Sequence, residues 1–116
     1  MEKRAIFYMG YIANQKKNGY FKIGTTRRAL KDRANELAKE HKNYKMLDYI
    51  VFNTTKAGIE LVESYVRFKL ECDGFTPKGN DFFTYEVSNK THKRMQVKAL
   101  CYAFECANIY GLQVME

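Results

Sequence analysis

The sequence is poor in the features that mark disordered, membrane-spanning and secreted proteins. It has one proline and seven glycines in 116 residues, and 46% of its residues are hydrophobic, which favours a compact fold over a disordered chain. No apolar run approaches the roughly 20 residues of a membrane-spanning helix, and the first residues lack the apolar core of a signal peptide. We therefore expect an intracellular, cytoplasmic protein that makes no contact with a membrane.

Cysteine is also scarce. Cys72, Cys101 and Cys106 form no CxxC pair, and an odd number of cysteines suits reduced thiols in a reducing compartment. Cys101 and Cys106 fall in an apolar helical run, so we expect them in the core. A zinc site formed by these two with His92 would need a spacing that fits no standard ligand pattern.

The length and the charge limit the fold and the partner. A chain of 116 residues fits one domain, residues 1–116, that buries about two thirds of its unfolded surface. The net charge of +7 is uneven, because residues 1–45 hold 12 Lys/Arg against 4 Asp/Glu, whereas residues 46–116 hold 8 against 9. Such a basic surface favours a polyanion such as DNA or RNA. A merely solvated lysine-rich face would give the same charge.

Hydrophobic periodicity alternates between strand and helix along the chain. The predicted strands are 5–13, 20–24 and 44–53, with a short strand at 81–87, and the predicted helices are 28–41, 55–71 and 90–110. We expect an α/β fold in which helices flank a small, mostly antiparallel three-stranded sheet. Residues from about 88 to 116 are expected to form a C-terminal covering helix.

Helical spacing also predicts which sides of the last two helices are buried. In the second helix the apolar stripe at i, i+3, i+7 and i+11 consists of Ile59, Val62, Val66 and Leu70, and Glu63 borders this stripe. In the third helix the predicted buried side contains Met95, Val97, Leu100, Cys101, Phe104 and Ala107.

One basic segment, residues 20–37, combines a strand, a glycine and an arginine-bearing helix. We expect Gly24 to turn the backbone and Thr25 or Thr26 to cap the helix that follows. Exposed N–H groups and cationic side chains would then meet at the helix start, where a phosphate binds well. The cations expected to contact nucleic acid there are Arg27, Arg28 and Lys31.

Further residues complete the inventory of a metal-assisted phosphodiesterase. The first strand is rich in tyrosine, Lys22 lies in the second strand, and Arg33 and Glu63 face inward from two helices. Cations offset charge on a phosphate, a carboxylate fixes a divalent cation, and a tyrosine hydroxyl exchanges a proton with water. We expect these groups to converge on one face of the sheet.

These residues resemble the GIY-YIG nuclease superfamily. The order Tyr8-Met9-Gly10-Tyr11-Ile12, Lys22-Ile23-Gly24, Arg33 and Glu63 is similar to the phage and virus branch whose second motif reads KIG. The resemblance covers about residues 5–85, and it implies a GIY-YIG-like fold and metal-dependent hydrolysis of DNA to a 5′-phosphate and a 3′-hydroxyl.

The resemblance also implies a role for each matching residue. Tyr11 is the first choice for the general base and Tyr8 the second. Because they are three positions apart, they face opposite sides of a regular strand, so one alone can be catalytic. Lys22 would hold the water or the phosphate, and Arg33 would clamp the scissile phosphate. Glu63 would be the metal-binding carboxylate, with Mg²⁺ as the expected ion and Mn²⁺ as a substitute.

Two positions depart from the branch or match it loosely. Arg67 stands where the branch often has histidine, which leaves it a phosphate contact rather than an acid or base. Asn80 resembles an asparagine of other GIY-YIG enzymes and is expected to contact nucleic acid. Because no separate DNA-reading domain accompanies this unit, specificity would need a homodimer or a partner protein.

Other interpretations compete with the nuclease. The tyrosines could be strand packing, Lys22 an edge-strand device, and Arg33 and Glu63 members of ordinary ion pairs. The same fold could also bind nucleic acid without cleaving it. A third hypothesis is a small protein-interaction factor, since nine tyrosines and eight phenylalanines are many for one small core and aromatic residues favour interfaces.

Overall fold

A computed structural model describes residues 3–12, 18–79, 82–86 and 91–115 of the chain. The elements, in chain order, are β1 (Arg4–Ile12), β2 (Asn18–Thr26), α1 (Leu30–Glu40), β3 (Tyr44–Asn53), α2 (Lys56–Cys72), β4 (Thr76–Lys78), β5 (Phe82–Glu86), α3 (Thr91–Tyr110) and β6 (Gln113–Met115). The predicted alternation of strands and helices is confirmed. None of the described helices is long and apolar enough to cross a membrane.

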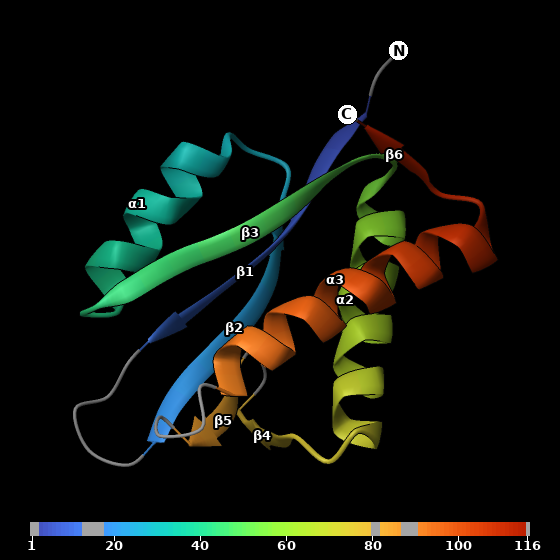
Figure 1. The fold of residues 1–116 in the computed structure, drawn as a ribbon. Coiled ribbons are helices and arrows are strands. Elements are labelled where there is room, and N and C mark those ends of the chain that lie inside the picture. Colours follow the sequence, from blue (N-terminus) through green and yellow to red (C-terminus); the bar gives the residue numbers. More distant parts are fainter. Residues whose placement is uncertain (1–2, 13–17, 80–81, 87–90, 116) are drawn as a thin grey trace.

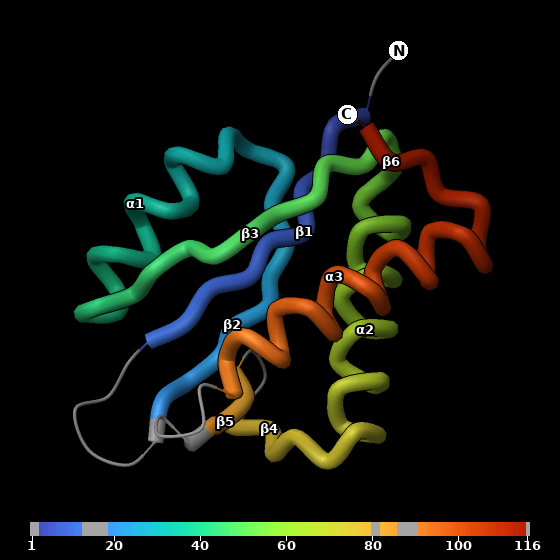
Figure 2. The backbone as a smooth tube through the Cα atoms, in the orientation of Figure 1, coloured from blue at the N-terminus to red at the C-terminus, as the bar shows by residue number. Residues whose placement is uncertain are grey.

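The strands form one sheet in the order β4-β5-β2-β1-β3-β6, and every neighbouring pair is antiparallel. Figure 2 shows β1 running between β2 and β3. The sheet therefore has six strands among the described residues, and not the three that we predicted. Strand β5 extends the sheet beyond β2, and the three-residue strands β4 and β6 form its two edges.

Helices cover the two faces of the sheet unequally, with α1 on one face and α2 and α3 on the other (Figure 1). Alternate residues of β1 supply both cores. Ala5, Phe7 and Met9 pack in the large cluster with α2 and α3, whereas Ile6 and Tyr8 pack with Leu37 of α1. Strand alternation thus places odd residues of β1 in one layer and even residues in the other.

Helices α2 and α3 bury different kinds of side chain against the sheet. In α2 the predicted stripe of Ile59, Val62, Val66 and Leu70 is fully buried. In α3 the prediction was partly wrong, because the buried residues are Met95, Ala99, Ala103, Cys106 and Ala107. Val97 and Phe104 are exposed, and so is Cys101, which we expected in the core. Small residues such as Ala99 and Ala103 thus form much of the buried side of α3 together with Met95, while Val97 and Phe104 face outward.

The start of α1 differs from the expectation. Gly24 lies inside β2 and does not turn the chain. The residue before α1 is Ala29, which offers no side-chain cap, and Asp32 occupies the first turn. Thr26 does not cap the helix. Its Oγ1 accepts a hydrogen bond from the Arg28 N–H at 3.1 Å, in the segment before α1 begins. The helix start therefore has a carboxylate where the sequence predicted a phosphate cradle.

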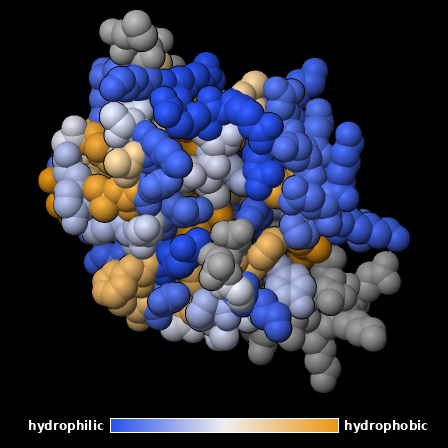
Figure 3. Space-filling model, turned by 180° about the vertical axis from the view of Figure 1, so that it is seen from behind, coloured by the Kyte–Doolittle hydropathy of each residue, from blue (hydrophilic) through white to orange (hydrophobic). Residues whose placement is uncertain are grey.

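Seen from behind, the molecule is mostly hydrophilic, with smaller apolar patches (Figure 3). The side that carries α1 is the more uniformly hydrophilic one in this view, and an apolar patch lies toward the side of α2. The surface around the layer that contains α1 is thus mainly polar in this view.

Candidate functional site

Tyr8 and Arg33 form the centre of the site, between β1 and α1. The Arg33 Nε donates a hydrogen bond to the Tyr8 hydroxyl oxygen at 3.0 Å. The Tyr8 side chain is 1% exposed, whereas that of Arg33 is 23% exposed, so the guanidinium reaches from the buried tyrosine to the surface. The Tyr8 oxygen accepts this bond, and its own O–H remains a donor.

The charge of Arg33 is secured by its surroundings. Burial by itself lowers the pKa of Arg33, but the hydrogen bond to Tyr8 and the nearby carboxylates of Glu40 and Glu36 outweigh it, and the pKa is raised. The Arg33 Nη1 lies 3.9 Å from Glu36 Oε1 and 3.8 Å from Glu40 Oε1. Arg33 is therefore a fixed cation that a phosphate oxygen can approach from the open side.

Two glycines make room for the tyrosines of this layer. A Cβ on Gly24 would lie 2.5 Å from the Tyr8 hydroxyl oxygen and 2.6 Å from its Cζ, because Tyr8 crosses Gly24 in the paired strand. A Cβ on Gly10 would likewise overlap the Tyr44 ring. Burial raises the pKa of Tyr44, so this second phenol stays protonated at neutral pH. The glycines of both sequence motifs serve close ring packing.

Lys22 lies on the same face of the sheet. It pairs with Gly10, one diagonal step from Tyr8 on the neighbouring strand, and it is 3% exposed. Its Nζ lies 4.9 Å from the centre of the Phe82 ring, a distance at which a cation is attracted by an aromatic face. Tyr8, Lys22 and Arg33 therefore share one layer, as the sequence predicted for these three.

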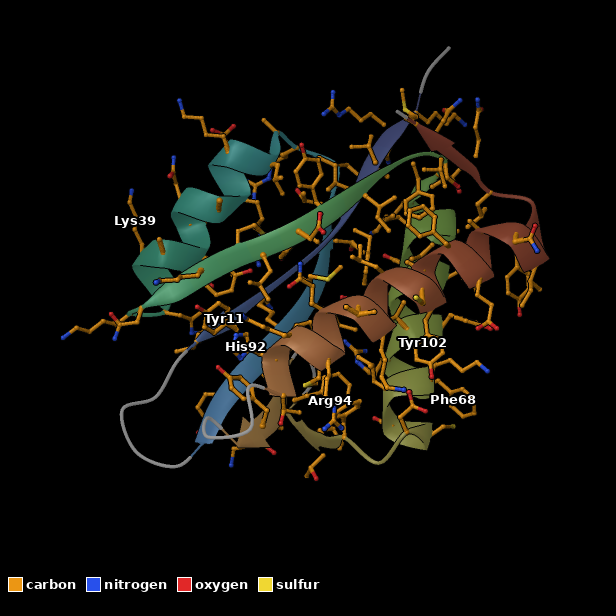
Figure 4. The ribbon with its side chains drawn as sticks, in the orientation of Figure 1. Tyr11, Lys39, Phe68, His92, Arg94 and Tyr102 are labelled. Atoms are coloured by element: carbon orange, nitrogen blue, oxygen red, sulfur yellow. The ribbon has the colours of Figure 1, made fainter. Side chains whose placement is uncertain are left out.

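Tyr11, the first choice for a catalytic tyrosine, lies on the opposite face. Its ring stacks on His92, with centroids 4.5 Å apart and an angle of 19° between the planes. His92 lies at the start of α3 (Figure 4). Tyr85 contacts the same histidine at 5.2 Å, and burial raises the pKa of Tyr85 to about 12. The structure thus brings Tyr8, and not Tyr11, to the helix arginine.

Glu63 and Arg67 come from α2, which covers the face opposite α1. The Arg67 Nη2 lies 3.9 Å from Glu63 Oε1, and the two side chains are 30% and 21% exposed. The sequence predicted that Glu63 and Arg33 would face a common side of the sheet, whereas their helices lie in different layers. Glu63 is partly open to solvent at the flank of the buried stripe of α2.

The remaining predicted nucleic-acid contacts differ in their surroundings. Arg27 and Lys31 are exposed. Arg28 is also exposed, but its Nη2 binds both carboxylate oxygens of Glu36, one of them at 3.0 Å. Asn80 lies outside the described residues. Arg27 and Lys31 are thus the open cations next to the start of α1.

Glu36, Glu40 and His41 lie beside Arg33 and were not among the site residues predicted from the sequence. Glu36 and Glu40 follow Arg33 at i+3 and i+7, which places all three on one side of α1. His41, the residue after α1, has its Nε2 3.8 Å from Glu40 Oε2. The helical spacing was visible in the sequence, and it could have identified these neighbours before the structure did.

A pocket of about 400 Å³ opens beside Glu40 and His41, between the end of α1 and strands β2 and β5. Tyr20, His41 and Phe82 line it together with Glu40 and two lysines, Lys42 and Lys78. The Phe82 ring meets His41 at 5.2 Å and Tyr20 at 6.2 Å, both edge to face. Because Glu40 contacts Arg33 and Lys22 contacts Phe82, the pocket adjoins the Tyr8 and Arg33 centre.

The residues present fit a magnesium ion in one mode only. Among the residues that the structure describes, no three His, Cys, Asp or Glu side chains gather closely enough to enclose a metal ion. Mg²⁺ is also held by one or two carboxylates together with water and substrate phosphates. The partly exposed carboxylate of Glu63 suits this second mode.

Comparison with known proteins yields a family but no individual relative. No curated protein and no solved structure matches the chain. The T5orf172 domain matches residues 6–101. This range includes Tyr8, Lys22, Arg33 and Glu63 and covers most of the sequence, and the chain therefore belongs to the T5orf172 domain family.

Proposed function

We propose that the protein is a metal-dependent DNA endonuclease with a GIY-YIG-like site. The observation that carries the proposal is the hydrogen bond from Arg33 to Tyr8, with Lys22 on the adjacent strand. Membership of the T5orf172 family is compatible with a nuclease-like or nucleic-acid-binding role. The basic amino-terminal part of the chain supplies the attraction for a phosphate backbone.

The chain's own groups divide the work of hydrolysis. The Arg33 guanidinium binds a non-bridging oxygen of the scissile phosphate and offsets the charge that develops there. The Tyr8 oxygen takes a proton from the attacking water while its own O–H proton passes to a solvent water. The new P–O bond forms as the bond to the 3′ oxygen breaks, and that oxygen takes a proton from solvent. The products are a 5′-phosphate and a 3′-hydroxyl.

Lys22 and Glu63 have supporting roles in this proposal. The buried Lys22 ammonium adds positive charge on the side of the phosphate next to Phe82. Glu63 is the carboxylate proposed to hold Mg²⁺, or Mn²⁺ in its place, but it comes from the layer opposite Arg33, so an ion held there would not contact the phosphate that Arg33 binds. Since Glu63 comes from the opposite layer, its variant is the most informative test of the metal assignment.

Cleavage of supercoiled plasmid with Mg²⁺ or Mn²⁺ tests the proposal. We expect Arg33→Ala to lower the rate by roughly 10²- to 10³-fold, as the loss of one charge-stabilising donor does, and Tyr8→Phe by roughly 10²- to 10⁴-fold. If Glu63 holds the catalytic ion, Glu63→Gln abolishes metal-dependent cutting. Lys39→Ala is the matched control, since Lys39 is an exposed cation on the same helix (Figure 4). The Lys39→Ala protein should cut DNA like wild type.

Two results would redirect the proposal. Equal cutting by all four variants would show that the activity comes from elsewhere. Loss of cutting in Glu40→Gln but not in Glu63→Gln would move the metal to the carboxylate that lies 3.8 Å from Arg33. Folding of each variant is checked by thermal melting.

One observation favours a second candidate, a module that binds nucleic acid without cleaving it. Glu63 is paired with Arg67 at 3.9 Å and comes from the layer opposite Arg33. Such a module needs the cations around α1 and no metal carboxylate. DNA binding that survives Glu63→Gln, with no product from wild type in either metal, would establish this function in place of the first.

A further inference from the structure

The pocket beside Arg33 has the dimensions and the walls of a site for a flat aromatic ring. Its volume is about 400 Å³, within the range of roughly 300 to 1,000 Å³ that small-molecule pockets occupy. Three of its lining side chains, Tyr20, His41 and Phe82, are aromatic. Edge-to-face contacts join Phe82 to the other two rings, so the wall is held as one unit.

The charges around the pocket point to a ring that carries a phosphate. Lys42 and Lys78 are exposed at the pocket, and Lys22 lies over the Phe82 ring at 4.9 Å. Glu40 is the acidic residue of the lining, and its carboxylate can accept a hydrogen bond from a base N–H. An aromatic wall with cations at its rim and one acceptor matches the chemistry of a nucleotide.

We propose that this pocket holds an unpaired base of a DNA strand whose phosphate lies against Arg33. In a duplex the faces of the bases are stacked on one another, so an aromatic wall has a partner only when a base leaves the stack. The preferred substrate class is therefore single-stranded or locally unpaired DNA. This inference rests on the proposed function, because it takes the strand to be held at Arg33.

Phe82→Leu tests the pocket, because leucine keeps apolar bulk for folding and removes the aromatic face. Binding of a fluorescently labelled single strand is compared with binding of the duplex of the same sequence, in EDTA so that no cleavage occurs. We expect Phe82→Leu to weaken single-strand binding by roughly 5- to 100-fold, the scale of one lost base stack, and to leave duplex binding unchanged. His41→Ala should act in the same direction without altering the sheet.

Phe104→Leu is the matched control, since Phe104 is 49% exposed on α3, in the opposite layer. It should bind both DNAs like wild type. A strand with 2-aminopurine gives a second readout, because the fluorescence of this base falls when it stacks. The wild-type protein should quench it, and Phe82→Leu should not.

The outcomes separate this inference from the proposed function. Equal weakening of strand and duplex by Phe82→Leu, or no weakening of either, overturns the base pocket even where Arg33→Ala abolishes binding. If Arg33→Ala has no effect on any DNA while Phe82→Leu keeps its strand-selective loss, the nuclease proposal fails and a base-binding pocket remains.

Discussion

At the scale of single residues, Gly24 and Tyr8 show how a motif glycine creates a functional position. The Tyr8 ring lies over Gly24, and its hydroxyl reaches Arg33 only because no Cβ stands in the way. The sequence predicted a turn at Gly24, since glycine commonly marks turns. Nothing local to residue 24 distinguishes a turn from a crossing ring, because the ring comes from the neighbouring strand.

We therefore expect Gly24→Ala to disturb the site through Tyr8. The added methyl group would lie 2.5 Å from the Tyr8 oxygen, so the ring must shift, and such overpacking lowers the free energy of unfolding by about 1–3 kcal/mol. Urea denaturation measures this change. In a Tyr8→Ala background the methyl group meets no ring, and the cost should largely vanish. An equal cost in both backgrounds would disprove the contact as the cause.

At the scale of helices and strands, the sequence predicted the long elements and missed the short ones. The stripe of α2 identified its buried side because four apolar residues repeat over three turns. Strands β4 and β6 have three residues each, too few for a period, and they exist because neighbouring edges pair with them. In α3 the small residues Ala99 and Ala103 face the core, a choice that depends on how closely its neighbours approach.

The sequence likewise predicted one part of the candidate site and missed another. Tyr8, Lys22 and Arg33 lie in one layer, as expected from their motifs, because strand alternation and helical spacing are local rules. The side of the sheet that α2 covers is a property of the chain's path between elements, so the position of Glu63 could not be read from its own neighbours. The pocket at Phe82 was also hidden, since it joins residues from α1, β2 and β5.

The end of α2 is tied to α3 in a way that depends on pH. The Tyr102 hydroxyl donates to Asp73 Oδ2, and Lys98 Nζ lies 3.3 Å from the same oxygen. The bond from Tyr102, followed by the bond from Lys98, lowers the pKa of Asp73 below its ordinary value of 3.8. Because the folded-state value is the lower one, this stabilisation is present above pH 3.8 and is lost as the pH falls through the lowered pKa.

Thermal melting between pH 7 and strongly acidic pH should reveal this link. We expect Asp73→Asn to melt at a lower temperature than wild type at pH 7 and the difference to shrink once the wild-type carboxyl is protonated. Glu71→Gln, which removes an exposed carboxylate two residues earlier, is the matched control and should follow the wild-type curve. A constant difference across the whole pH range would exclude the Asp73 charge as its source.

At the scale of the whole molecule, the uneven charge sets how the protein should respond to salt. Binding of a DNA duplex should weaken linearly on a log–log plot of affinity against salt concentration, because bound cations release counterions from the phosphates. Loss of one phosphate contact in Arg33→Ala should reduce the steepness of this line by about one unit. Fluorescence anisotropy in a KCl series measures it, and Lys39→Ala should retain the wild-type slope.

The site spans two parts of the fold that differ in how firmly they are held. Tyr8 belongs to the central strand, which has a paired strand on each side and core residues on both faces. Arg33 belongs to a helix that the small cluster of Ile6, Tyr8 and Leu37 attaches to the sheet. Local opening of a protein starts where the least apolar surface is buried. We therefore expect α1, which carries Arg33, to open locally before the central strand that carries Tyr8.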